Sequence, residues 1–113
     1  MIERRKYVRL QAHLGLSYQA AHGLQEQQRR TIVRNLSGGG LCINVPDDLR
    51  EGDLLQVQLE VPHLRSSVRA VAEVVWTTRQ GAGRNNEVGL RFRDMSDQDL
   101  HHVLEYVHTV GIG

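Results

Sequence analysis

Two short segments rich in arginine and glycine hold the side chains best suited to ligand chemistry. The first reads Arg4-Arg5-Lys6-Tyr7-Val8-Arg9 and the second reads Asn35-Leu36-Ser37-Gly38-Gly39-Gly40, which gives the patterns RRxxxR and NxSxxG. Guanidinium groups present planar forks of donors that match paired phosphate oxygens. Together with an amide, a hydroxyl and a backbone free of side chains, they predict a site for a flat, phosphate-bearing ligand rather than a catalytic centre.

Each segment has a simpler interpretation when it is taken alone. Asn, Ser and Gly are ordinary turn formers, so the 37–40 segment by itself indicates a hairpin turn. A basic N-terminal arm by itself indicates a disordered tail. The combination of the two segments in one short chain favours the ligand site.

Composition limits the size and the location of the protein. A chain of 113 residues with 40% hydrophobic content suits one domain with one core. No apolar stretch approaches the roughly 20 residues of a membrane span, and the start has no apolar signal region. We therefore expect a cytoplasmic protein without membrane insertion. The lone Cys42 excludes an internal disulfide bond and fits an ordinary strand position.

The charges are unevenly distributed along the chain. The net charge is only +1, which does not suit a protein that coats a nucleic acid polymer. Basic residues gather at 4–9 and at Arg29, Arg30 and Arg34, whereas the residues after Arg93 include four acidic side chains and no Lys or Arg. One end of the molecule should attract anions. A small RNA-binding barrel is disfavoured because one Phe, one Trp and three Tyr offer few stacking platforms.

Hydrophobic alternation predicts a mostly β protein. Apolar residues alternate with polar ones over 10–20, 55–61, 68–76 and 88–93, and shorter runs at 31–36 and 41–45 complete the set. Turn-forming residues separate these runs. Several short strands at this spacing predict a small antiparallel barrel or sandwich.

The C-terminal segment has a helical period instead. Ser96 begins a typical helix cap, and apolar residues then recur at helical spacing over 100–110. The pattern predicts one amphipathic helix over 96–110, with Gly111 as its stop.

Other chemical signals are weak. His101, Glu105 and His108 share a helical face, but no fourth metal ligand accompanies them. Gly81-Ala82-Gly83 lacks the third glycine of a dinucleotide loop. No Ser, Cys or His lies in a nucleophile motif. We therefore expect neither an enzyme nor a metal protein.

The order of these features resembles the PilZ domain over nearly the whole chain. RRxxxR precedes the first strand, NxSxxG ends a strand, a Val88-Gly89-Leu90-Arg91-Phe92 strand follows, and a helix closes the chain. The resemblance implies an all-β fold: a six-stranded antiparallel Greek-key-like barrel with one C-terminal α-helix. It divides a single domain, 1–113, into a flexible basic arm at 1–9, a barrel at 10–93 and a helix at 96–110.

The resemblance also implies a ligand, the bacterial second messenger cyclic di-GMP. The residues that match the family motifs are Arg5, Arg9, Asn35, Ser37 and Gly40, with Gly39 in the same loop. Arg4 supplies the preceding arginine that in this family tends to accompany an intercalated ligand dimer. Trp76 is a further candidate for stacking on guanine, although its place in the apolar alternation favours core packing.

The resemblance further implies a signalling role without a cofactor. Ligand binding is expected to order the arginine arm over the barrel and to change the surface presented to a partner. An unidentified downstream protein, or a homodimer interface, would detect that change. The alternative is a PilZ-like adaptor that binds proteins and no nucleotide.

Overall fold

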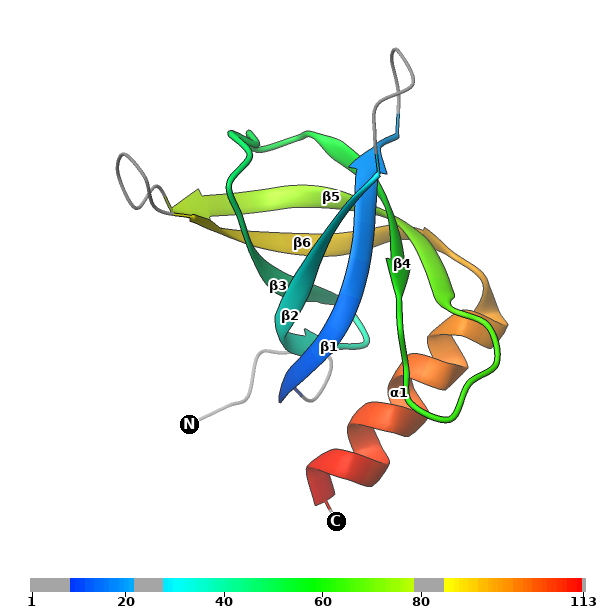
Figure 1. The fold of residues 1–113 in the computed structure, drawn as a ribbon. Helices are drawn as coiled ribbons and strands as arrows, with labels where there is room; N and C mark the ends of the chain where they lie inside the picture. The colour runs from blue at the N-terminus through cyan, green and yellow to red at the C-terminus, as the bar shows by residue number, and fades with distance from the viewer. Residues whose placement is uncertain (1–8, 22–27, 79–84, 113) are drawn as a thin grey trace, which may run out of the picture.

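The computed structural model describes residues 9–21, 28–78 and 85–112. Within these ranges it contains six strands and one helix (Figure 1). The elements are β1 (Arg9–Ala20), β2 (Arg29–Ser37), β3 (Gly40–Val45), β4 (Leu54–Leu59), β5 (Val68–Thr78), β6 (Asn86–Met95) and α1 (Asp97–Ile112). The arm residues Arg4 and Arg5 lie outside the described residues.

The six strands close into an antiparallel barrel. Their order around the barrel is β1-β2-β3-β6-β5-β4, and β4 returns to pair with β1. The spatial order 4-1-2-3 is that of a Greek key. The predicted Greek-key-like barrel with a C-terminal helix is therefore confirmed.

The barrel interior is filled by the apolar residues of the alternating pattern. Leu16, Val57 and Ala72 have at most 2% of their surface exposed, while Gln11 and Gln56, from the opposite face of their strands, are exposed. Alternate residues of a strand point to opposite faces of a sheet, so burial of one face fixes the register of every strand.

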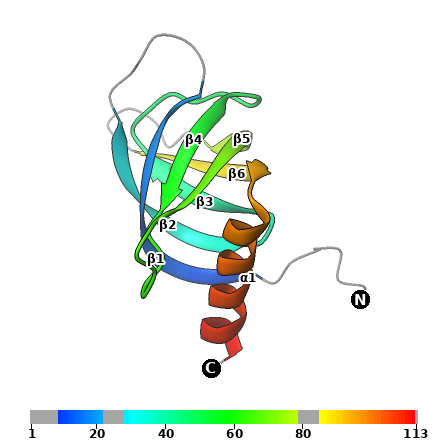
Figure 2. The same ribbon diagram turned by 90° about the vertical axis from the view of Figure 1, so that its right-hand side faces the viewer.

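Helix α1 covers one end of the barrel. Val103 and Val107 are buried and pack into the core cluster, and α1 contacts β1, β2 and β5. The Ser96 hydroxyl accepts a hydrogen bond from the Asp99 N–H at 3.0 Å, which confirms the predicted N-cap. The C-terminal half of α1 extends past the strands (Figure 2). No helix among the described residues is long and apolar enough to cross a membrane.

The helix is longer than expected. It runs from Asp97 to Ile112, so the prediction that Gly111 ends it was wrong. Glycine in a helix costs only about 1 kcal/mol relative to alanine. Here Gly111 lies near the Leu10 side chain of β1, whose Cδ1 would be 3.8 Å from a Cβ at Gly111.

Two arginines of β2 pair with carboxylates. Arg29 Nε lies 3.4 Å from Asp47 Oδ1, and Arg30 Nη1 lies 2.7 Å from Glu60 Oε1. Asp47 also accepts a hydrogen bond from the buried Tyr18 hydroxyl. These pairs join β2 to neighbouring segments of the barrel, so Arg29 and Arg30 act in the fold.

Candidate ligand-binding pocket

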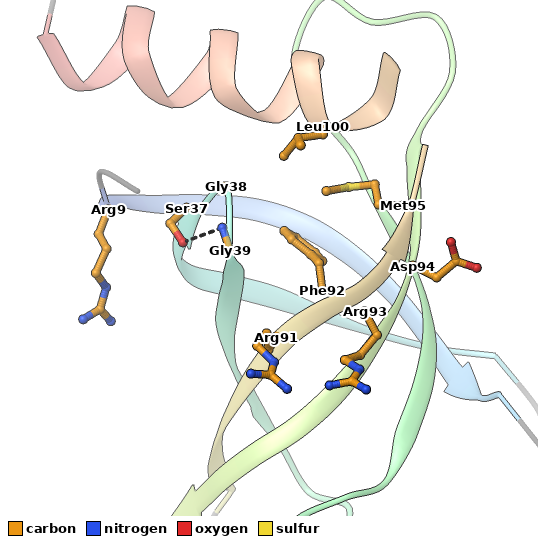
Figure 3. A pocket seen from close by; sticks show the side chains of 10 residues that line it. All are labelled: Arg9, Ser37, Gly38, Gly39, Arg91, Phe92, Arg93, Asp94, Met95 and Leu100. Atoms are coloured by element: carbon orange, nitrogen blue, oxygen red, sulfur yellow. Dashed lines mark hydrogen bonds between the residues drawn. The ribbon is translucent and has the colours of Figure 1, made fainter. Parts of the chain in front are cut away.

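The loop between β2 and β3 is held by its own serine. The Ser37 hydroxyl accepts a hydrogen bond from the Gly39 N–H at 3.1 Å (Figure 3). The same hydroxyl donates to the Gly40 carbonyl at 3.5 Å. The Ser37 hydroxyl thus supports its own loop, which agrees with the turn expected at 37–40.

Gly40 is required by the neighbouring strand. A Cβ at this position would lie 2.0 Å from the Leu90 carbonyl oxygen of β6, far inside contact distance. Glycine is the residue that permits such close approach of two backbones. The motif assigned Gly40 to the ligand site, and the structure adds a structural reason for glycine at this position.

A β-bulge in β2 places Asn35 beside Arg9. Val33 pairs with Ile43 and Asn35 pairs with Cys42, so Arg34 is an extra residue on β2. Arg9 is the first residue of β1 and lies opposite Ser37. Its guanidinium Nη2 donates to the Asn35 side-chain oxygen at 3.2 Å. The last arginine of RRxxxR and the first residue of NxSxxG are thus in direct contact.

A second bulge turns Trp76 out of the barrel. Val74 pairs with Leu90 and Trp76 pairs with Gly89, which makes Val75 an extra residue on β5. Val74 is fully buried, but Trp76 is 38% exposed. The prediction that Trp76 packs in the core was therefore wrong, because the bulge interrupts the alternation on which it depended.

The Trp76 indole rests on Gly89. A Cβ at Gly89 would lie 2.1 Å from the indole Nε1, so a larger residue there would displace the ring. Glycine inside a strand often marks a place where another group approaches closely. The exposed indole ring of Trp76 therefore packs on the backbone of β6 at Gly89.

The two bulges border one small pocket. Its volume is about 210 Å³, and we call it the bulge pocket. Its lining includes every predicted site residue that the structure describes, namely Arg9, Asn35, Ser37, Gly39, Gly40 and Trp76. Arg4 and Arg5 are outside the described residues. Leu41, Cys42, Val75, Gly89 and Leu90 complete the lining, and the sequence had not assigned them to the site.

A larger hollow of about 590 Å³ adjoins the bulge pocket and shares Arg9, Ser37 and Gly39 with it. We call it the arginine pocket because Arg9, Arg91 and Arg93 line it. Figure 3 shows apolar side chains gathered between β6 and α1, with Arg91 and Arg93 on the other side of β6.

The arginines of this larger pocket share one acidic partner. Glu73 Oε1 lies 3.7 Å from Arg91 Nη2 and 3.2 Å from Arg93 Nη1. All three side chains are at least a quarter exposed, so each pair is weak. One carboxylate between two guanidiniums leaves the pair of arginines with an excess of positive charge.

The Cys42 thiol lines the bulge pocket, and its pKa depends on the charged groups around it. Burial, followed by the nearby Glu87 carboxylate, raises the pKa of Cys42 to about 11. The guanidiniums of Arg34 and Arg9 act in the opposite direction and lower that pKa. The thiol stays protonated near neutral pH and is a poor nucleophile, while the field of two arginines reaches the pocket.

Helix α1 carries His101, Glu105 and His108, the residues noted above for sharing a helical face. His101 Nε2 lies 3.2 Å from Glu105 Oε2, which is an exposed pair one helical turn apart. No group of three or more His, Cys, Asp or Glu within the part of the chain that the structure describes has a metal-binding arrangement.

Comparison with protein families decides the classification. The model of the PilZ domain matches residues 3–109. The chain belongs to the PilZ domain family. Comparison with curated protein sequences finds no match. PilZ domains are receptor or adaptor domains.

Solved structures share the fold at low sequence identity. The Bacillus subtilis inhibitor of motility MotI/DgrA superposes with a TM-score of 0.83 at 23% identity, covering 98% of this chain and 53% of that one. Escherichia coli YcgR in complex with c-di-GMP gives 0.76 at 16% identity, covering 98% and 47%. The PilZ domain of the same YcgR with c-di-GMP gives 0.69 at 17% identity, covering 97% and 93%. This chain spans about half the length of the first two proteins.

Proposed function

We propose that this PilZ domain is a receptor for cyclic di-GMP. The observation that carries the proposal is the bulge pocket, where the described members of both sequence motifs meet in about 210 Å³. The c-di-GMP complexes of two structurally similar YcgR chains support the choice of ligand. The ligand is a flat dinucleotide with two phosphates, which matches the chemistry of the pocket.

Each side chain of the pocket has a distinct part in this proposal. The Arg9 guanidinium would bind a phosphate, or the Hoogsteen edge of guanine, with two parallel hydrogen bonds. Asn35 would exchange its hydrogen bond with Arg9 for one with the Watson-Crick edge of guanine, which its amide can meet as donor and acceptor. Trp76, already exposed where it packs on Gly89, would stack on a base.

The proposed ligand form is an intercalated dimer. Arg4 is the sequence feature behind this proposal. The adjoining arginine pocket supports it, because its roughly 590 Å³ and its shared wall with the bulge pocket offer room for a second nucleotide. Arg91 and Arg93 would add positive charge beside four ligand phosphates. We therefore expect two ligands per chain.

The proposed response is a change in the N-terminal arm. Arg4 and Arg5 would bind the ligand together with Arg9, which would order residues 1–9 over the barrel. The new surface would then be recognised by a downstream protein or by a second copy of the chain. A nucleotide transmits a signal only if the partner distinguishes the two states.

Calorimetric titration tests the proposal. Cyclic di-GMP should bind the wild type at micromolar concentrations or below, with GTP and cyclic di-AMP as controls. Arg9→Ala should weaken binding about 10- to 100-fold, since a charge-assisted hydrogen bond contributes about 1.5–3 kcal/mol. Arg50→Ala is the matched control, because Arg50 is exposed and lines neither pocket. If the wild type gave no binding heat, the receptor proposal would be wrong, and the alternative of an adaptor that binds proteins and no nucleotide would take its place.

A further inference from the structure

A second groove lies between the β4–β5 connection and α1. Its volume is about 440 Å³, and we call it the α1 groove. Its walls include Pro62, His63, Leu64, Glu105, Tyr106 and Val110. None of these residues belongs to the sequence motifs or to the two pockets described above.

The groove offers apolar surface to a partner. Leu64 and Tyr106 are half-buried against the core, and Val110 is 48% exposed. Large side chains that remain exposed beside a hollow are a common sign of a docking surface. The volume of about 440 Å³ lies within the range of about 300–1,000 Å³ that is typical of ligand pockets.

The wall opposite the helix is formed by a strained turn. The Leu64 N–H donates to the Val61 carbonyl at 3.2 Å, and His63 has φ 71°. This is the third position of a type II turn, where glycine or asparagine is normally found. Such outliers occur most often at functional sites. Here the turn places an imidazole and a leucine on the groove.

The charge of the groove indicates the type of partner. Glu105 is the one Asp, Glu, Lys or Arg in its lining, which also holds His63 and His102. Helix α1 contains no Lys or Arg, and its other two acidic residues, Asp97 and Asp99, lie in its first turn, away from the groove. Arg65 belongs to the neighbouring connection but does not line the groove. An apolar hollow whose lining carries one carboxylate and no Lys or Arg favours a segment that combines apolar with cationic side chains.

We propose that the α1 groove binds a short segment of a partner protein in which one or two large apolar side chains are flanked by Lys or Arg. A second copy of this chain fits the groove poorly, because two acidic α1 helices would repel each other. The partner of opposite charge gains both burial and electrostatic attraction. This inference concerns a surface separate from the nucleotide site and does not depend on the proposed ligand.

A peptide-display selection tests this proposal. The full chain is immobilised and presented with a random peptide library, and enriched peptides are synthesised for titration. Enriched sequences should combine Lys or Arg with Leu, Ile, Phe or Trp, and Glu105→Lys should weaken their binding about tenfold or more. Enrichment of acidic peptides, or no enrichment, would overturn the proposal.

A pair of helix variants supplies the matched control. Val110→Lys and Leu104→Lys make the same change of charge on α1, at residues that are 48% and 36% exposed. Leu104 does not line the groove. Val110→Lys should weaken peptide binding about tenfold and Leu104→Lys less than about twofold. Equal effects would overturn the proposal, as would a concentration-dependent dimer of the wild type that Val110→Lys abolishes.

Discussion

The bulge pocket and the α1 groove are opposite in chemistry although the whole chain carries a charge of only +1. The pocket gathers Arg9, Asn35 and an exposed tryptophan around a glycine loop. The groove gathers leucine, tyrosine and valine around a glutamate. The comparison teaches that net charge is a poor guide to function when charged side chains of opposite sign line different hollows. It also predicts that the two surfaces can be disabled separately.

The largest effect should come from Gly40→Ala. This substitution should impair the bulge pocket and the α1 groove alike, because it damages the fold that supports both. The added Cβ would lie 2.0 Å from the Leu90 carbonyl oxygen, where β3 and β6 close the barrel. We expect the free energy of unfolding to fall by about 3 kcal/mol in urea denaturation. Gly111→Ala is the control: its Cβ finds only an ordinary contact at 3.8 Å, so stability should be maintained or slightly raised. Equal stability of the two variants would refute the close β3–β6 contact.

Trp76→Ala should separate the two surfaces. Loss of stacking on a base should weaken cyclic di-GMP binding by about 1–3 kcal/mol, measured by calorimetry. Because Trp76 is 38% exposed and outside the core cluster, the melting temperature should change little. Peptide binding to the α1 groove should be unchanged. A large loss of stability with unchanged nucleotide affinity would instead assign the indole a structural role.

Ser96→Ala should weaken the start of α1 without touching the nucleotide site, because Ser96 lines neither the bulge pocket nor the arginine pocket. It removes the hydroxyl that accepts from the Asp99 N–H at 3.0 Å, and an N-cap contributes about 1 kcal/mol. Unfolding measurements should show that loss. Cyclic di-GMP affinity should stay within about twofold, a difference of roughly 0.4 kcal/mol. Ser66→Ala, at an exposed loop serine, is the control. A parallel loss of nucleotide binding would show that the helix cap and the pocket are coupled.

Glu73→Gln should produce the smallest effect of these substitutions, a gain in nucleotide affinity because the nucleotide site becomes more positive. The substitution releases Arg91 and Arg93 from their shared carboxylate, and exposed ion pairs contribute about 0–1 kcal/mol. Nucleotide affinity should therefore rise by up to about fivefold at low salt and less at high salt. Weaker binding would mean that Glu73 positions these arginines for the ligand.

The fold was predictable because it depends on a pattern repeated along the whole chain. Alternation at residues such as Leu16 and Val57 reports which strand face is buried. The helix cap at Ser96 was predictable for the same reason, since a cap is a local arrangement. Asn35 and Ser37 could be singled out from the motif, and the structure places both on the bulge pocket.

The bulge pocket was harder to predict from the sequence. Bulges at Arg34 and Val75 shift the register of β2 and β5, and the bulge at Val75 exposes Trp76. Neither Arg34 nor Val75 is a residue type that signals a bulge. Gly89 was the one available sign, because glycine within a strand suggests a bulge or a close approach. The pairing of Arg91 with Glu73 was hidden as well, since it joins residues on different strands.

The most direct test of the central claim is an NMR titration of the ¹⁵N-labelled chain with cyclic di-GMP. Trp76 is the single tryptophan, so its indole N–H gives one resonance. The account predicts that this signal and the amides of Asn35, Gly39 and Gly40 shift on binding, while the amides of α1 at 102–110 stay in place. Shifts confined to α1, or none at saturating nucleotide, would contradict it.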